Sequence, residues 1–392
     1  MAVGTTCCWG KLSPLAPRPD WSRLDACQET ITRAEFQSLL DRVYAPGGAW
    51  AAVISLTNKE ATIRAGTGRA EYRLRFAPSA ASAHGVPAYW HGRAGHSGEP
   101  GLPLAGLKIA IDPGHLGGSW AKMEERWFQI GKSTPVAEGD MTLRVAKLLV
   151  PRLTALGAKV FLTRSKPGPV TSARPGQLRK AAAASLRDKN EAVTPGAVKK
   201  ESQRLFYRAS EIRRRARLVN ESIRPDIVLC LHFNAEEWGN ERKPRLVNEN
   251  HMHFLVTGSW SRAELDCEDQ RLEMLVKLLN RSFREELPLT TAVAQSMAKA
   301  TGLPPYTYHG GKAASVNGNP YIWARNLLAN RLFSCPVVYV EPYVMNSRSV
   351  FARIQAGDYK GTRNFAGTAR QSLYREYADG VAAGLVNYYT HR

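Results

Sequence analysis

Short apolar runs alternate with stretches of helical periodicity from Leu104 to the end of the chain, and this order leaves few folds open. Alternating strands and helices are typical of βαβ units built around a parallel sheet. We therefore predict the α/β fold class, with a largely parallel twisted sheet flanked by helices. The strands expected here are 109–111, 158–163, 226–231, 252–256 and 337–340, and the helices are 140–156, 201–223, 263–286, 292–300, 321–331 and 366–390. Pro151 should bend or divide the first of these helices, and Gly157 should cap it.

Side chains that can bind a metal or transfer a proton follow several of these strands. The first strand stops at Asp112-Pro113-Gly114, so His115 is presented on the loop at its carboxyl end. His232 follows the third strand and Glu341 the last, while Glu138 opens the first long helix. Ligands of open α/β sheets bind at the carboxyl ends of the strands. Two histidines and a carboxylate from separate elements form the catalytic arrangement that zinc favours, and a second carboxylate can serve as the acid–base group.

Five motifs of this region occur together in one order. They are Ile109-Ala-Ile-Asp-Pro-Gly-His115, Glu138-Gly-Asp-Met-Thr-Leu-Arg-Val-Ala146, Leu162-Thr-Arg164, Leu229-Cys-Leu-His-Phe-Asn-Ala235 and Val338-Tyr-Val-Glu-Pro-Tyr-Val-Met-Asn346. In this order they resemble the zinc-dependent N-acetylmuramoyl-L-alanine amidases of the Amidase_3 type, which include sporulation and cell-division amidases. The resemblance covers roughly residues 106–390 and implies the phosphorylase/hydrolase-like amidase fold.

The resemblance also implies roles for individual residues. His115, Glu138 and His232 match the zinc ligands of the family, and Glu341 matches its catalytic carboxylate. Three further positions match residues that shape the site or contact the substrate: Asn234, Asn346 and Arg325, the last of which resembles the arginine of the helix before the final strand.

The choice of the ligand carboxylate stays open. The segment between His115 and Glu138 is longer than is usual in the family, so Glu124 or Glu125 could take the place of Glu138. The Asp-Met-Thr-Leu sequence that follows Glu138 matches the family pattern and favours Glu138.

Other polar and aromatic residues allow two interpretations. His251 and His253 share one face of a strand, where a structural or supporting role fits better than ligation. Tyr306, Tyr308 and His309 fit either the wall of a substrate cleft or an ordinary surface loop.

Three regions are expected along the chain. Residues 1–76 should form a small N-terminal α+β module with an irregular start, in which Thr32 and Glu35 mark a helix N-terminus and strands occupy 50–56, 61–65 and 72–76. Residues 77–103, rich in Ala, Gly, Pro and His, form a linker or an extended segment that lies on the next domain. The catalytic domain then spans 104–392, with a basic insertion at about 166–217.

The charge of the chain is strongly positive. The formal net charge is +20, and Lys166–Arg217 holds fourteen Lys and Arg residues against four Asp and Glu. Such a surface attracts polyanions, although a solvated helical insertion explains it as well. No recognisable nucleic-acid motif accompanies the charge. The resemblance to the amidases implies peptidoglycan as the polymer partner, and a specific nucleic acid is not expected.

Signals for cellular location are few. The six cysteines contain no CxxC pair and predict no disulfide scaffold, and no run of eighteen apolar residues predicts a transmembrane helix. The N-terminus lacks the features of a signal peptide. From the resemblance we nevertheless expect the cell envelope, the periplasm or the extracellular space.

The site residues and the resemblance together imply a zinc-dependent hydrolase that cleaves the amide between N-acetylmuramic acid and L-alanine in peptidoglycan, in wall remodelling or daughter-cell separation. Two alternatives share the same features: a zinc metallopeptidase with another substrate, and a non-catalytic wall-binding protein.

Overall fold

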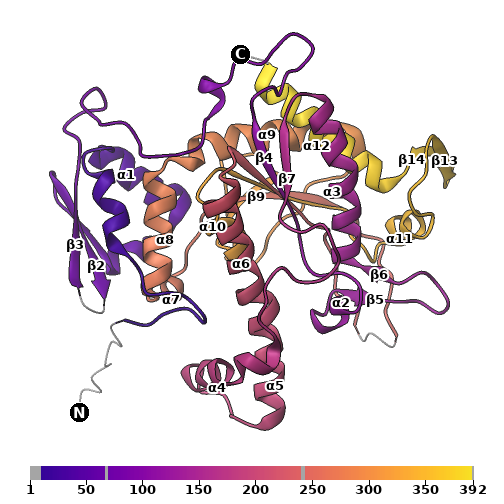
Figure 1. The fold of residues 1–392 in the computed structure, drawn as a ribbon, viewed down its shortest axis with the longest axis horizontal. Helices are drawn as coiled ribbons and strands as arrows, with labels where there is room; N and C mark the ends of the chain where they lie inside the picture. The colour runs from indigo at the N-terminus through magenta and orange to yellow at the C-terminus, as the bar shows by residue number, and fades with distance from the viewer. Residues whose placement is uncertain (1–9, 67–68, 240–242, 391–392) are drawn as a thin grey trace.

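The computed structural model describes residues 10–66, 69–239 and 243–390 (Figure 1). Within these residues a seven-stranded sheet has the order β10-β11-β9-β12-β8-β4-β7. Strands β12, β8, β4 and β7 are parallel to one another, whereas β9 runs antiparallel to β12, β11 follows β9, and β10 reverses again. The predicted α/β class with a largely parallel sheet is confirmed.

The strands of this sheet are β4 (Lys108–Pro113), β7 (Lys159–Leu162), β8 (Ile227–Leu231), β9 (Met252–Thr257), β10 (Ala314–Ser315), β11 (Ile322–Arg325) and β12 (Val337–Pro342). The helices that accompany it are α2 (Trp120–Met123), α3 (Glu138–Ala155), α4 (Arg179–Asp188), α5 (Pro195–Leu205), η6 (Phe206–Ser210), α6 (Glu211–Arg217), η7 (Leu218–Ile223), α7 (Arg262–Leu265), α8 (Glu268–Leu279), α9 (Ser282–Thr301), α10 (Leu328–Arg331), α11 (Arg348–Gln355) and α12 (Leu373–Thr390). Two short hairpins add β5 (Trp127–Phe128) with β6 (Val136–Ala137), and β13 (Thr362–Phe365) with β14 (Thr368–Gln371).

Both faces of the sheet are covered by helices. Alternate residues of β8 show this division, since Ile227, Leu229 and Leu231 pack with residues of α3, α9 and α12. Val228 and Cys230 point the other way and pack with residues of α6, η7 and the segment that follows α10. A strand that is buried on both faces is apolar throughout, which explains the unbroken hydrophobic run of β8.

Four predicted helices differ in the structure. Residues 322–325 form strand β11 instead of a helix, because Ile322 and Ala324 are buried in the sheet and pair with β9. Residues 362–371 form the β13–β14 hairpin, so α12 begins only at Leu373. The prediction places a break between two helices at residues 287–291. In the structure the break between α8 and α9 lies earlier, at Arg281, whose φ is 57°.

Helix α3 agrees with the prediction at its end, and Pro151 does not divide it in two. It is one helix from Glu138 to Ala155 and contains Pro151, so the chain is not divided there. Gly157 follows with a φ of 98°, the left-handed conformation expected of a glycine beyond a helix C-terminus.

The N-terminal residues pack against α8. This region contains η1 (Trp21–Cys27), α1 (Arg33–Leu39), η2 (Leu40–Tyr44), η3 (Ala49–Ala52), β1 (Ile54–Leu56), β2 (Glu60–Gly66) and β3 (Arg69–Arg75). Thr32 caps α1 by accepting a hydrogen bond from the backbone N–H of Glu35, as predicted. The first predicted strand is shorter than expected, because 49–52 forms a 3₁₀ turn. Buried side chains of these elements share one core with Leu272, Leu275 and Leu278 of α8.

Residues of the segment 77–103 contact the sheet domain. The His91 ring contacts Asp226, the backbone N–H of Arg93 donates to Glu285, and the His96 ring packs on Tyr389. Among the described helices, none is both long and apolar enough to cross a membrane. The four described cysteines are buried and free, while Cys7 and Cys8 lie outside the described residues.

Candidate active site

His115 is held by a carboxylate at the carboxyl end of β4. Its φ is 60°, a left-handed conformation that is uncommon outside glycine and often found at functional sites. One oxygen of Glu124 lies 2.7 Å from Nδ1 of His115, and the other accepts the backbone N–H of Leu116 at 2.7 Å. Glu124 therefore fixes the ring so that Nε2 faces the interior of the site.

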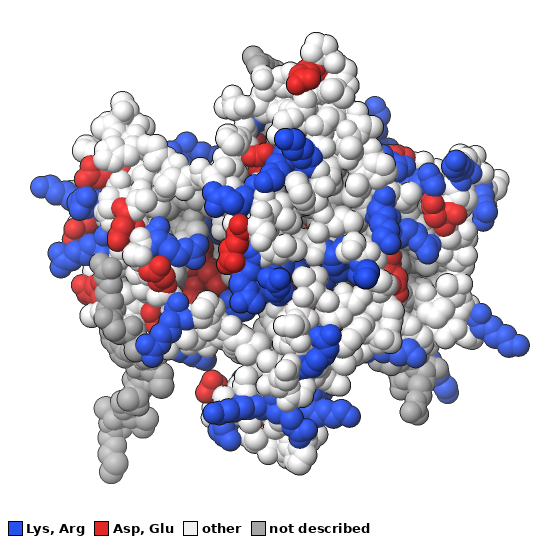
Figure 2. Space-filling view, viewed as in Figure 1, with Lys and Arg blue, Asp and Glu red and all other residues white. Residues whose placement is uncertain are grey.

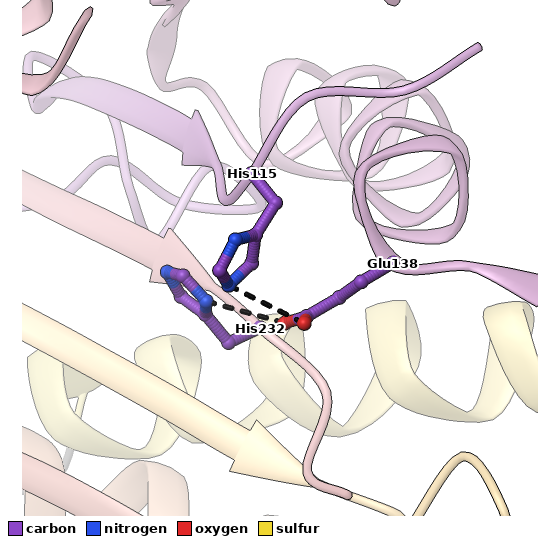
Figure 3. A group of neighbouring side chains, drawn as sticks. All are labelled: His115, Glu138 and His232. Carbon is purple, nitrogen blue, oxygen red and sulfur yellow. Dashed lines mark ion pairs between the residues drawn. The ribbon is translucent and has the colours of Figure 1, made fainter. Parts of the chain in front are cut away.

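Two histidines and one carboxylate meet at this edge of the sheet (Figure 3). His115 Nε2 lies 3.3 Å from Glu138 Oε2, and His232 Nδ1 lies 3.3 Å from Glu138 Oε1. One candidate ligand atom from each of the three residues lies within 4.8 Å of the other two. Parallel strands β4 and β8 end side by side, which explains why residues more than a hundred positions apart converge.

Two glycines allow this close approach. A Cβ placed on Gly114 would lie 2.3 Å from Cε1 of His232, and one placed on Gly139 would lie 2.2 Å from the backbone of Leu116. Arg164, from the Leu-Thr-Arg motif, donates to the carbonyls of Gly139 at 2.6 Å and Gly114 at 3.1 Å. It thereby ties the loop after β4 to the start of α3.

Charges inside the site keep its carboxylates ionised. Burial would raise the pKa of Glu138, but His115, His232 and Arg126 outweigh it and lower that pKa. For His115, burial would lower the pKa, but Glu138 and Glu124 outweigh it and raise it. The cluster thus brings an ionised carboxylate together with two histidines, a group of side chains that could hold a cation.

Glu341 lies beside this cluster and is bound by His253. Antiparallel pairing of β9 with β12 puts His253 directly opposite Glu341, and Nε2 of His253 lies 3.1 Å from Glu341 Oε2. Burial would raise the pKa of Glu341, but His253, His232 and Arg325 lower it to about 2. Glu341 is therefore a carboxylate at neutral pH, available to accept a proton.

The other predicted site residues occupy different places. Asn234 lies in the site and contacts His251 and His253. Arg325 ends strand β11 and not a helix, which corrects that expectation; its side chain reaches back to donate to the Tyr308 hydroxyl at 3.1 Å. Asn346 is fully buried and accepts the backbone N–H of Glu236, so it braces a loop.

The structure brings the aromatic loop to the site. Tyr306 and Tyr308 line a pocket of about 350 Å³ with His115, Glu138 and Glu341. An adjoining pocket is lined by the same His115 and Glu341 and by Tyr207 and Arg208 of the basic insertion. The insertion therefore forms one wall of the active-site cleft.

Two arginines of the site could not be identified from the sequence. Arg126 lies 3.4 Å from Glu138 Oε2, and buried Arg215 contacts Asp112 at 3.1 Å and the carbonyl of His115 at 3.1 Å. Arg215 belongs to a run of basic residues, and nothing in that run distinguishes the buried arginine from its exposed neighbours.

Fold and site define an α/β enzyme that could hold a divalent metal at the carboxyl ends of its parallel strands. The family model of N-acetylmuramoyl-L-alanine amidase matches residues 109–364. This chain belongs to that amidase family. It is a cell-wall hydrolase that cleaves the amide between N-acetylmuramic acid and L-alanine in peptidoglycan.

Solved structures of amidases are also similar to the chain. The apo form of the amidase Ami1 from Mycobacterium abscessus has 18% identity and a TM-score of 0.39, and covers 73% of this chain and 99% of its own. The CwlD amidase from Clostridioides difficile, solved in complex with the GerS lipoprotein, has 13% identity and a TM-score of 0.40, and covers 72% and 98%. AmiC2 of Nostoc punctiforme has 14% identity and a TM-score of 0.38, and covers 74% and 98%. No curated protein matches the chain.

Proposed function

We propose that the enzyme is zinc-dependent and that His115, Glu138 and His232 are the ligands. Two imidazoles and one carboxylate are a donor set that zinc favours in catalytic sites. The strongest support is the Glu124 carboxylate at the far nitrogen of His115, because zinc-bound histidines commonly donate their other N–H to a carboxylate. Glu124 thus fits the role of a supporting residue, and Glu138 that of the ligand.

Glu341 would be the acid–base group of the reaction. A zinc ion in this site would lower the pKa of a bound water to about 7 and polarise the scissile carbonyl. Glu341 accepts the proton of the attacking water and then delivers it to the amine of the departing L-alanine. Its ionised state at neutral pH supports the first of these roles.

The replacement Glu341→Ala tests this assignment. The variant should retain one zinc ion per chain and lose turnover on purified sacculi, since the lost carboxylate is not among the proposed ligands. Product analysis should show that the wild-type enzyme frees stem peptides with new L-alanine amino termini. Full activity of the variant, or peptides with a different new terminus, would contradict the proposal.

The substrate suggests the location of the enzyme. Peptidoglycan lies outside the cytoplasm, so we propose that the protein acts in the cell envelope or periplasm, or outside the cell. Fractionation of cells that express the full-length chain, followed by immunoblotting, tests this directly.

A further inference from the structure

The basic insertion folds into a separate helical lobe next to the cleft. We call residues 175–205, which contain α4 and α5, the basic lobe; Figure 1 shows it extending from the body of the molecule below α6. The lobe has a small core of its own, formed by Ala182, Leu186, Val198 and Leu205. It continues into η6 and α6, where Tyr207 and Arg208 line the active-site cleft.

Cations outnumber acids on the surface of this lobe, and one of its acids is buried. Glu201 is buried and accepts hydrogen bonds from Ser185 at 2.6 Å, Lys189 at 2.8 Å and Arg204 at 2.6 Å. The exposed cations of the lobe are Arg179, Lys180, Arg187, Lys189, Lys199 and Lys200, while its exposed acids are Asp188 and Glu191. Figure 2 shows Lys and Arg side chains across the face of the lobe that is turned to the viewer.

We propose that the basic lobe is a second binding surface for peptidoglycan and that it contacts the carboxylates of stem peptides other than the one being cleaved. This inference rests on the proposed function. Stem peptides carry free carboxylates and repeat along the glycan strands, so a strand that occupies the cleft offers further anions nearby. Continuity of the lobe with the cleft wall favours this polymer over an unrelated polyanion.

Binding to sacculi without covalently attached anionic polymers tests the proposal. In the zinc-loaded full-length enzyme, the quadruple variant R179Q/K180Q/K199Q/K200Q should bind sacculi about tenfold or more weakly at low salt, and the difference should shrink as salt rises. The matched control R42Q/K59Q/K299Q/K360Q loses the same charge at exposed positions elsewhere and should bind like the wild type.

Two further measurements separate the outcomes. Both quadruple variants should cleave a small soluble muramoyl-peptide like the wild type, since the changed side chains lie outside the cleft. Sacculi whose carboxylates have been amidated should bind the wild type as weakly as native sacculi bind the lobe variant. Wild-type-like binding by the lobe variant, or tight lobe-dependent binding to amidated sacculi, would overturn the proposal. If the wild-type enzyme does not cleave the small substrate, the proposed function is instead refuted.

A second inference comes from the side-chain amide of Asn234, which contacts the rings of His251 and His253. The Oδ1 atom of Asn234 accepts the backbone N–H of Ala235 at 2.8 Å, so its Nδ2 faces Nδ1 of His251 at 3.2 Å and Nδ1 of His253 at 3.3 Å. Because Nδ2 can only donate, both Nδ1 atoms accept, and each ring carries its proton on Nε2. That proton faces Glu236 at 2.9 Å in His251 and Glu341 at 3.1 Å in His253.

His253 is enclosed so that its ring cannot turn away. Its side chain is 2% exposed, Tyr306 packs at 5.2 Å between ring centroids, and the Tyr308 hydroxyl also lies 2.8 Å from Nε2. Arg325 donates to the same hydroxyl at 3.1 Å. We propose that His253 is a positioning residue, which fixes the Glu341 carboxylate through Nε2 while Asn234 fixes its tautomer.

The kinetics of two variants at position 253 test this role. His253→Ala should lower kcat on a soluble muramoyl-peptide by about tenfold or more, with KM and zinc content near wild type, because misplaced catalytic groups slow chemistry more than binding. His253→Gln offers an N–H donor in the place of Nε2 and should restore most of kcat. His251→Ala, two residues away on the same strand and bound by the same amide, is the matched control and should retain far more of kcat.

Three results would overturn the role of His253. They are a kcat of His253→Ala within twofold of wild type, an equal loss of kcat in His251→Ala, and a failure of His253→Gln to restore activity. Thermal denaturation of each variant shows that the measured protein is folded.

Discussion

Replacing Glu124 with Gln should weaken zinc binding without changing any proposed ligand. The carboxylate of Glu124 offers two oxygens, one 2.7 Å from Nδ1 of His115 and the other 2.7 Å from the backbone N–H of Leu116. Gln has one oxygen and one NH₂ group, so one of these two contacts becomes a pair of facing donors. The residue is only 7% exposed, and water cannot easily replace the lost acceptor.

The size of the effect follows from these contacts. A hydrogen bond to a charged group contributes about 1.5–3 kcal/mol, and about 1.4 kcal/mol corresponds to a tenfold change in affinity. We therefore expect the zinc dissociation constant of Glu124→Gln to rise by about 10- to 150-fold. Residues that support metal-bound histidines in other proteins show effects of about 10- to 100-fold.

Competition with a chromophoric chelator measures this constant. The matched control is Glu125→Gln, since Glu125 is the neighbouring residue but is exposed and should bind zinc like the wild type. Glu138→Gln should bind zinc more weakly than Glu124→Gln, because it changes a ligand. An unchanged constant in Glu124→Gln would refute the supporting role, and stronger zinc binding by Glu138→Gln than by Glu124→Gln would exchange the two assignments.

Further predictions concern Gly114, the buried ion pair of Lys277 with Glu286, and the pH dependence of zinc binding. Gly114→Ala should lower the zinc content and activity by more than tenfold, because its Cβ would lie 2.3 Å from the His232 ring, whose displacement misplaces a ligand. Lys277→Met should lower the free energy of unfolding in urea by about 3–5 kcal/mol, since fully buried Glu286 loses the ammonium 2.6 Å away. Zinc binding by the metal-free protein should weaken as pH falls, with a midpoint above the ordinary histidine value of 6.5, because the raised pKa of His115 lets protons compete at higher pH.

Controls for these predictions exist in the same chain. Gly176→Ala introduces a Cβ into open space and should keep the zinc content of the wild type. Lys277→Met combined with Glu286→Gln should recover part of the lost stability, because no unpaired buried charge remains. Zinc titrations that show a midpoint below pH 6.5 would contradict the expected effect of the carboxylates on His115.

The central strands could be predicted because burial on both faces makes their sequences continuously apolar. Val337–Val340 and Ile227–Leu231 are such runs, and each ends in a polar residue at the carboxyl edge. The candidate ligands follow directly, since parallel strands place their ends together. The resemblance to the amidase motifs favoured Glu138 as the carboxylate ligand. The structure places that carboxylate in one group with His115.

The peripheral elements could not be predicted in the same way. Strand β11 has a sequence compatible with a helix, and its pairing with β9 decides its conformation. The sequence also does not indicate that β9 runs antiparallel to β12. This direction brings His253 to the edge of the sheet where Glu341 lies. Local patterns carry no signal for contacts between segments nearly ninety residues apart. The contact between His253 and Glu341 could therefore not be predicted from the sequence.

The shared interior of the N-terminal elements and α8 has a consequence for any attempt to shorten the chain. Trp21, Phe36 and Tyr44 lie in one continuous apolar layer with Leu275 and Leu278. An excised version starting at residue 104 would leave one side of that layer in water, and such a patch favours association between molecules. A shortened version would therefore need polar replacements on the face of α8 that the N-terminal elements cover.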